Sequence, residues 1–283
     1  MASPAQAADV AKPDADGQWA VGVGRAGGFC RDGRGAGRDA CADRIAKREC
    51  DHLTAAPAGS GALNTTRARM EPRQAMMHLT PISGVDPVGD PRLSTALQLA
   101  EACDYEVDHS HQVTRLALCL FDQLRETSGY GDEDRFTLNA AALLHDIGWI
   151  EGRRAHHKTA MRLILESPVL DFDSSMRLIV GLIARYHRKA LPDAARHQRL
   201  ASLDDADQGT VRLLAGILRT ADGLDGSHRN VVNALRVDAD KAQVRITCGV
   251  TGDGTWEQER AESKGDLLAA TLNRRLTVQC MPG

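Results

Sequence analysis

The stretch Ala141-Ala-Leu-Leu-His145-Asp146-Ile-Gly148 is the part of the sequence around which the other segments can be arranged. An apolar run of helical character ends in an adjacent histidine and aspartate, and Gly148 then lets the chain leave the helix at once. An imidazole nitrogen beside a carboxylate oxygen is a ligand pair suited to a divalent metal. One His-Asp pair arises easily by chance, so the interpretation depends on the other histidines and aspartates.

The sequence around this stretch is strongly helical from Pro91 onward. Apolar residues recur at the i, i+3, i+4 and i+7 spacing of helices that pack one face on a core. Gly129-Tyr-Gly131 interrupts the pattern, and Asp132-Glu-Asp then supplies acidic residues suited to the start of a helix. The predicted helices lie, in chain order, near residues 93–100, 109–124, 132–145, 157–166, 174–187 and 211–226.

The periodicity changes after residue 230. Residues 231–237 and 242–248 alternate apolar with polar side chains, and Asp238-Ala-Asp-Lys separates them, which predicts a β-hairpin. A helix near residues 261–273 and a last strand at 275–280 would complete a small α/β unit. We therefore predict a mostly α fold, with a helical domain at residues 86–229 and a C-terminal α/β appendage at residues 230–283.

The N-terminal part, residues 1–85, differs from the rest. Glycine, alanine, arginine and aspartate dominate it, and large apolar residues are sparse and without period. Such a segment cannot bury enough apolar surface to offset the entropy lost on ordering, so we predict that it is disordered. The abrupt change in composition also suggests that translation begins at Met70, Met76 or Met77. A zinc site is an alternative that the wide spacing of its candidate ligands disfavours: Cys30, Cys41, Cys50 and His52.

The overall composition excludes several classes of protein. The formal net charge is −3, which gives no reason to expect nucleic-acid binding. No apolar run approaches the roughly 18 to 20 residues of a membrane span, and the first residues lack the pattern of a secretory signal. The seven cysteines are odd in number and irregularly spaced, which is typical of reduced thiols in a cytoplasmic protein.

Further candidate metal ligands lie at the ends or on the faces of the predicted helices. A buried divalent site needs four to six donors gathered from several elements, because each donor replaces a lost water. At most one of the adjacent histidines His156 and His157 needs to be a ligand. The candidates are, in chain order, His109, His145, Asp146, His156 or His157, His187 and Asp222.

The order of these residues resembles that of the HD superfamily of metal-dependent phosphohydrolases. The segment His109-Ser-His-Gln-Val-Thr-Arg-Leu-Ala is similar to the first-helix box of that superfamily, in which the first histidine is the ligand. A narrower resemblance links His156-His-Lys-Thr-Ala, Ala184-Arg-Tyr-His-Arg-Lys and Leu218-Arg-Thr-Ala-Asp-Gly-Leu-Asp-Gly-Ser-His to the HD-type domain that ends exopolyphosphatase and guanosine pentaphosphate phosphatase proteins.

This narrower resemblance extends from about Arg92 to the C-terminus, and the hairpin, helix and strand also look like the segment that follows the HD-type domain in those proteins. About 90 poorly hydrophobic residues precede it. We therefore do not expect in this sequence the actin-like phosphatase domains that carry catalysis in the full-length enzymes. Polyphosphatase chemistry is accordingly not transferred to it.

The resemblance implies the identity of the ligands. The superfamily pattern assigns His109, His145, Asp146 and Asp222 to a metal site, with Asp146 bridging if two ions bind. His157 and His187 match two extra histidines of dinuclear members, and on this pattern His157 is preferred to His156. Mixed imidazole and carboxylate ligands favour manganese or iron over magnesium, with zinc as a further alternative.

Other residues are expected to act on the substrate or on the ligands. Lys158, Arg188 and Lys189 flank the candidate histidines and could neutralise phosphate, although solvated helix ends would have the same composition. Asp225 and His228 could orient ligands.

Two departures from the patterns of other HD superfamily members disfavour two classes of substrate. Trp149 and Ile150 stand where guanosine tetraphosphate hydrolases carry an acidic pair, and nothing after His187 resembles the Gly-Tyr-Pro motif of cyclic-di-GMP hydrolases.

We therefore predict a hydrolase that cleaves a phosphoester or phosphoanhydride of a small phosphorylated compound, such as a nucleotide, by metal-activated hydroxide. Asp146, Lys158 and Arg188 are the expected catalytic residues, and one or two divalent ions are the expected cofactor. The alternative is a regulatory module that binds a nucleotide or polyphosphate without cleaving it. A structural helical adaptor with incidental donors is a third, weaker alternative.

Overall fold

The computed structural model describes residues 79–282, apart from the side chains of residues 126–128, and these residues belong to one compact unit. The predictions for residues 1–78, which include disorder, the zinc alternative and later translation starts, lie outside the described residues. The described region begins earlier than the predicted boundary at residue 86. Strand β1 (Thr80–Pro81) pairs with β2 (Val232–Ala239), and Ile82 in the following 3-10 turn is buried.

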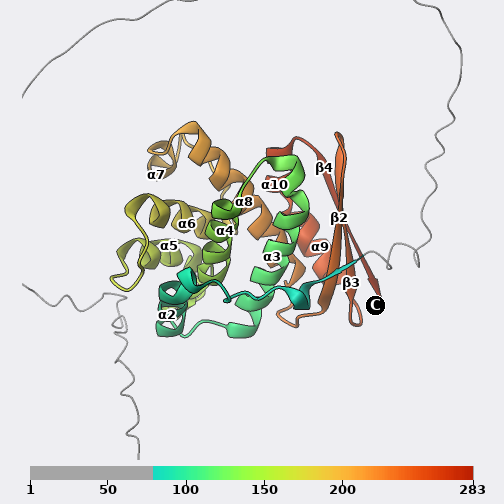
Figure 1. Ribbon diagram of the computed structural model, residues 1–283, viewed down its shortest axis with the longest axis horizontal. Helices are drawn as coiled ribbons and strands as arrows, with labels where there is room; N and C mark the ends of the chain where they lie inside the picture. Colours follow the sequence, from blue (N-terminus) through green and yellow to red (C-terminus); the bar gives the residue numbers. More distant parts are fainter. Residues whose placement is uncertain (1–78, 283) are drawn as a thin grey trace, which may run out of the picture. The chain divides into compact units, whose positions relative to one another are not determined.

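The predicted mostly α fold with a small C-terminal α/β part is confirmed (Figure 1). The periodic apolar segments form the helices expected from them. Two 3-10 turns, Ile82–Gly84 and Pro91–Leu93, precede the first of these helices. The helices of the first part are α2 (Ser94–Ala102), α3 (Val107–Ser128), α4 (Asp132–Leu144), α5 (His156–Glu166), α6 (Ser174–Tyr186), the short α7 (Gln198–Ala201) and α8 (Asp205–Leu224), with the 3-10 turn η3 (Ile147–Glu151) between α4 and α5.

Helix α8 is the central element of this part. Asp204 caps its start by accepting a hydrogen bond from the backbone of Asp207, which satisfies a free N–H of the first turn. Every residue from Leu213 to Leu224 is buried. A helix that is buried on all sides near its end can place polar side chains in the interior, and Asp222 lies in this buried turn.

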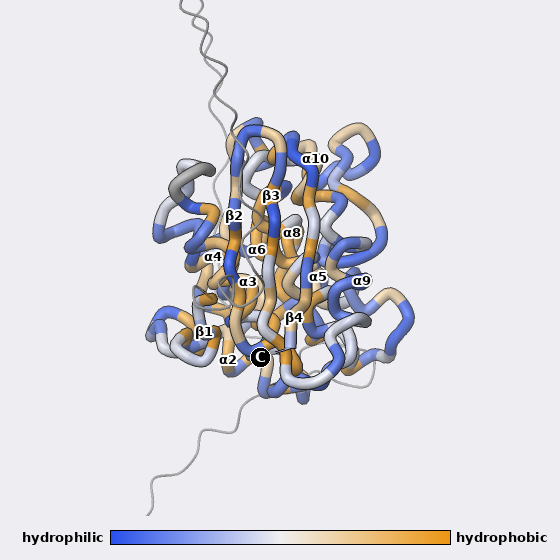
Figure 2. Tube along the Cα trace, turned by 90° about the vertical axis from the view of Figure 1, so that its right-hand side faces the viewer, coloured by the Kyte–Doolittle hydropathy of each residue, from blue (hydrophilic) through white to orange (hydrophobic). Residues whose placement is uncertain are grey.

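The C-terminal part, together with β1, forms a four-stranded sheet with two covering helices. Strand β2 pairs antiparallel with β3 (Gln243–Val250), as the hairpin prediction requires, whereas β4 (Arg275–Pro282) runs parallel to β3. The crossover contains α9 (Thr255–Lys264) and α10 (Asp266–Leu272), which divide at Gly265 where one helix was predicted. Figure 2 shows the strands side by side with the helices behind them.

Two glycines allow the close approaches that position the candidate site. A Cβ at Gly148 would lie 2.1 Å from the carbonyl oxygen of His156, and a Cβ at Gly223 would lie 2.6 Å from the Cα of Ala261. Gly148 therefore lets η3 lie against the start of α5, and Gly223 lets α9 lie against the end of α8. No described helix has the length and apolar character needed to cross a membrane.

Candidate metal centre

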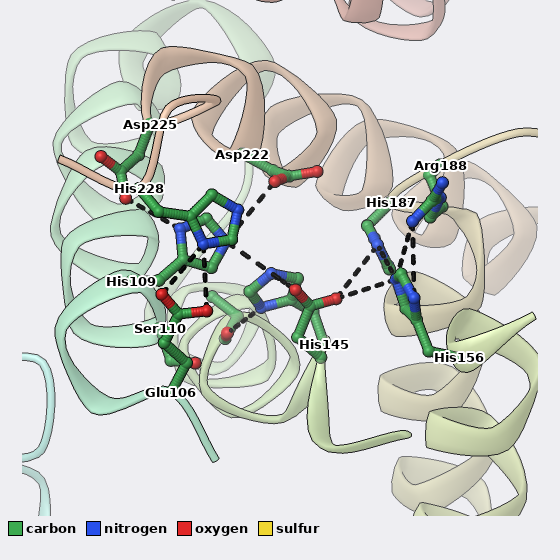
Figure 3. A network of polar contacts seen from close by, with 12 residues as sticks. Glu106, His109, Ser110, His145, His156, His187, Arg188, Asp222, Asp225 and His228 are labelled. Carbon is green, nitrogen blue, oxygen red and sulfur yellow. Dashed lines mark hydrogen bonds and ion pairs between the residues drawn. The ribbon is translucent and has the colours of Figure 1, made fainter. Parts of the chain in front are cut away.

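The predicted donors come from the ends of five helices. His109 lies in the first turn of α3, His145 and Asp146 follow the last residue of α4, and His187 follows the last residue of α6. His156 is the first residue of α5, and Asp222 lies in the last turn of α8. Figure 3 shows the four imidazoles directed toward one another from these separate helices.

The two oxygens of the Asp146 carboxylate face two different histidine pairs. Oδ2 lies 3.5 Å from Nε2 of His145 and 3.8 Å from Nε2 of His109. Oδ1 lies 3.1 Å from Nε2 of His156 and 3.4 Å from Nε2 of His187. In each group the three ligand atoms lie within 4.8 Å of one another, and the two groups share Asp146.

Asp222 lies on the His109 side. Its Oδ1 is 3.7 Å from Nε2 of His109. The separations of 3.5 to 3.8 Å on this side are longer than ordinary hydrogen bonds. They are close to the spacing of about 3.0 to 3.5 Å between two ligand atoms that each bind one ion at about 2.1 Å.

Hydrogen bonds fix the orientation of the histidine rings. Nδ1 of His109 lies 2.8 Å from Oδ2 of Asp225, a carboxylate with no solvent exposure. Nδ1 of His145 lies 2.7 Å from the carbonyl oxygen of Ala142, and Nδ1 of His187 lies 2.6 Å from that of Ala184. A ring that donates from Nδ1 presents an unprotonated Nε2 to a metal.

The Nε2 atoms of His109 and His145 are buried and form no hydrogen bond within the described residues. A buried polar atom without a partner is costly, so its presence needs a reason. A divalent cation bound between these atoms and the carboxylates of Asp146 and Asp222 would remove the cost. This observation shows that the residues fit a metal ion.

The protonation states that the surroundings favour also suit a cation. Burial lowers the pKa of His145, and it lowers the pKa of His187 to about 3. Burial alone would raise the pKa of Asp146, but the histidines, His145 foremost, hold it well below the usual value. Burial opposes protonation of His109 too, but the hydrogen bond to Asp225 and the nearby carboxylates raise its pKa. The neutral imidazoles of His145 and His187 beside the ionised Asp146 can bind a metal without releasing protons, whereas His109 would release one wherever it is protonated.

The two adjacent histidines have different positions relative to the centre. His156, not the predicted His157, directs its ring at Asp146 and His187. His157 is also buried, but among the described residues its Nδ1 has no hydrogen-bond partner and the residue belongs to neither donor group. Successive residues of a helix point about 100° apart, so only one of the two can face the centre. The backbone of Ala155, with φ of 62°, sets which one it is.

The three residues that were predicted to contact phosphate do not all lie near the centre. Arg188 lies at the centre, with Nη1 3.1 Å from Nε2 of His156, and Lys189 lines the adjacent cavity. Lys158 is exposed and does not line that cavity. Its predicted catalytic role therefore has no support from its position.

A cavity of about 430 Å³ opens onto Asp146, His156, His187 and Asp222. Its wall is strongly basic and combines side chains of the helical part with side chains of α9. Among the cations, Arg260 and Lys264 come from α9, where the spacing of four residues places them on one helix face. The basic residues in the wall are Arg153, Arg188, Lys189, Arg219, Arg260 and Lys264.

Two contacts at the candidate metal centre were not predicted from the sequence. The ammonium group of Lys264 forms an ion pair with Oδ2 of Asp222. His228, which was expected near the ligands, stacks on the ring of His109 with centroids 3.7 Å apart, and its Nδ1 lies 3.0 Å from the carboxylate of Glu106. The spacing of Arg260 and Lys264 on α9 could have identified Lys264 as a candidate from the sequence. The sequence around Glu106 has no pattern that indicates a role at the centre.

Comparison with known proteins agrees with the architecture of the described region. Residues 92–269 match the family described as Ppx/GppA phosphatase, domain III. A guanosine-5'-triphosphate,3'-diphosphate pyrophosphatase of Pseudoalteromonas atlantica is 27% identical over 133 residues. The matched part is 47% of this chain and only 26% of that protein, so the similarity spans about a quarter of the relative. Since the family match covers more than half of the sequence, the chain belongs to the Ppx/GppA phosphatase domain III family.

Proposed function

We propose that this protein is an HD-type, divalent-metal-dependent phosphohydrolase that acts on a phosphoester or phosphoanhydride of a small phosphorylated compound, such as a nucleotide. The observation that carries the proposal is the Asp146 carboxylate between two histidine pairs, with the Nε2 atoms of His109 and His145 buried and without hydrogen-bond partners. Membership in a phosphatase family agrees with hydrolysis of a phosphate bond.

The proposed ligands form two groups that share Asp146. His109, His145, Asp146 and Asp222 would hold one ion, and Asp146, His156 and His187 would hold a second. Manganese or iron suits this mixture of imidazole and carboxylate better than magnesium does, with zinc as an alternative. A bound divalent ion supplies Lewis-acid polarisation of the phosphoryl oxygens and activation of water.

The side chains of the protein have separate tasks in this proposal. Asp225 keeps the His109 ring in its orientation through the Nδ1 hydrogen bond. Arg188 and Lys264 border the same cavity, where their charges would bind phosphate oxygens and compensate the charge that develops during cleavage. We assign metal binding to the helical domain of residues 86–229, and part of the substrate wall to α9 of the appendage, residues 230–283.

Metal content and turnover of an Asp146→Asn variant test the proposal. Asparagine keeps the shape of the side chain but removes the shared charge, so bound manganese and hydrolysis of bis-p-nitrophenyl phosphate should both fall to background. Asp205→Asn, at an exposed position in the first turn of α8, is the matched control and should behave as the wild type. Wild-type turnover in a folded Asp146→Asn protein would refute the proposal.

A second candidate function is a regulatory module that binds a nucleotide or polyphosphate without cleaving it. The ion pair between Lys264 and Asp222 favours it, because this contact engages one of the carboxylates that the metal would need. The six cations of the cavity wall also suit a polyanion. Tripolyphosphate binding measured by calorimetry in the presence of chelator, without turnover when manganese is added, would select this alternative.

A further inference from the structure

Two cysteines lie opposite each other on neighbouring strands, away from the metal centre. Cys248 of β3 and Cys280 of β4 are paired in a parallel register, so their side chains lie on the same face of the sheet. Neighbouring strands are about 4.8 Å apart, and disulfides join Cα atoms that are about 4.4 to 6.8 Å apart. Figure 2 shows these two strands adjacent along their length. The backbone therefore permits a bond between the two sulfurs.

The two thiols differ in their access to solvent. Cys248 is completely buried. Cys280 is partly exposed and lines a cavity of about 470 Å³, together with Gly254 and Thr255 at the start of α9. Of the two residues, only Cys280 is therefore open to a small reagent from solvent.

The pKa values of the two thiols make the same distinction. The contact with Cys248 lowers the pKa of the Cys280 thiol, although burial alone would raise it. The same contact raises the pKa of Cys248, and its burial adds to that effect. Since the thiolate is the reactive form of cysteine, Cys280 is the better nucleophile of the pair.

We propose that Cys280 and Cys248 form a redox-reactive dithiol that a hydroperoxide converts into a disulfide, with Cys280 as the attacking and Cys248 as the resolving cysteine. An accessible nucleophilic thiol beside a second cysteine is the arrangement that supports reversible oxidation. The site is independent of the proposed hydrolase function, because neither cysteine belongs to the metal centre or its cavity.

The reaction balances with hydrogen peroxide as the oxidant. The Cys280 thiolate attacks one peroxide oxygen, an S–O bond forms, the O–O bond breaks, and a proton completes the departing water. The Cys248 sulfur then attacks the sulfur of the Cys280 sulfenic acid, an S–S bond forms, the S–O bond breaks, and a second water leaves with the thiol proton. Two thiols and one peroxide give one disulfide and two waters.

The chain provides a control for general cysteine oxidation. Cys103 is buried, and burial raises its pKa to about 12, so it should react slowly with peroxide. The three cysteines at positions 30, 41 and 50 should be replaced by serine to remove competing thiols from the region that the structure does not describe. The protein otherwise remains the full chain.

The experiment treats this triple-serine protein with one equivalent of hydrogen peroxide, blocks remaining thiols with iodoacetamide and maps the tryptic peptides by mass spectrometry. Cleavage at arginine places Cys248 in residues 246–260 and Cys280 in residues 276–283. We expect these peptides to appear joined, two hydrogens lighter than their sum, and roughly tenfold faster than Cys103 is oxidised. The linked species should disappear on reduction.

Two single variants in the same background test the order of the steps. In Cys248→Ser, the sulfenic acid of Cys280 should persist and be trapped by dimedone. In Cys280→Ser, Cys248 should remain a thiol. A linked pair that forms no faster than Cys103 oxidation, a bond from Cys280 to another cysteine, or dimedone labelling of Cys248 in the Cys280→Ser protein would overturn the proposal.

Discussion

The two sides of the Asp146 carboxylate differ in the partners of their imidazole nitrogens. On the side of His109 and His145, both Nε2 atoms lack hydrogen bonds, and the nearest carboxylate oxygens are 3.5 to 3.8 Å away. On the side of His156 and His187, the two Nε2 atoms lie 3.4 Å apart, and Arg188 is 3.1 Å from His156. Both sides have separations near those of a cation site, but on the second side the two imidazoles contact each other and a positive charge lies beside them.

This difference indicates that the two sides bind metal with different strength. Electrostatic repulsion from Arg188 opposes a second cation at His156 and His187, while the carboxylates of Asp146 and Asp222 attract a cation at His109 and His145. The second side is then a weaker metal site, or a phosphate site in which Arg188 is the principal contact. The predictions below separate these two sides, beginning with the largest expected effect.

The largest effect should come from a comparison of His145→Gln with His187→Gln. We expect His145→Gln to weaken binding of the first manganese ion by more than a hundredfold, since loss of an orienting residue alone costs about 10- to 100-fold. His187→Gln should leave the first ion within a few-fold of the wild type and remove only the second. Calorimetric titration of manganese into chelator-treated protein measures both. Equal loss in the two variants would show that the sides bind as one unit.

Asp225→Asn should have the next largest effect, because Asp225 acts on the metal only through the Nδ1 atom of His109. Asparagine keeps a hydrogen bond but loses the charge that supports the ring, so the first ion should bind about 10- to 100-fold more weakly. The second side should be unaffected. Manganese titration again measures the change, and circular dichroism checks that the buried substitution leaves the fold intact. Weakening confined to the second ion would contradict the role given to Asp225.

His156→Gln and His157→Gln form the closest matched pair in the chain. His156 faces Asp146, whereas its neighbour belongs to neither donor group. We expect His156→Gln to lower the turnover of bis-p-nitrophenyl phosphate by about tenfold, the lower end of the range for loss of a residue that supports a metal site. His157→Gln should stay within about twofold. A larger loss from His157→Gln would restore the assignment that the sequence favoured.

The same pair illustrates how far a sequence can predict such a site. The helices follow from local apolar spacing, and the candidate donors at their ends stand out for the same reason. The choice between His156 and His157 cannot be predicted in this way, because it depends on the direction in which the first turn of α5 points. That direction is set by the backbone of Ala155 and by the contact of α5 with Gly148, neither of which has a distinctive local pattern.

The position of Lys264 in the fold could not be predicted from the sequence either. Its position depends on the packing of α9 against α8, which Gly223 permits, and on the parallel pairing of β4 with β3. Both are tertiary features that arise from segments far apart in the chain. Periodicity predicted that a strand ends the chain, but it contains no information on whether that strand runs parallel or antiparallel to its neighbour.

The smallest predicted effect is the contribution of His157 to stability in acid. Burial, together with the neighbouring His156, Arg188, Arg185 and Lys189, lowers the pKa of His157 to about 4, compared with about 6.5 in an unfolded chain. Between these values the unfolded chain binds a proton that the folded protein does not, so the free energy of unfolding decreases as the pH falls from 6.5 toward 4.

His157→Gln removes this proton uptake, so its stability should depend less on pH over that range. We expect the variant to lose less stability than the wild type between pH 7 and pH 5, by a difference on the order of 1 kcal/mol after partial exposure to solvent is considered. Urea unfolding at several pH values, with chelator present, measures the difference without a contribution from metal. If the free energy of unfolding depended on pH equally in the two proteins, His157 would already be protonated in the folded protein.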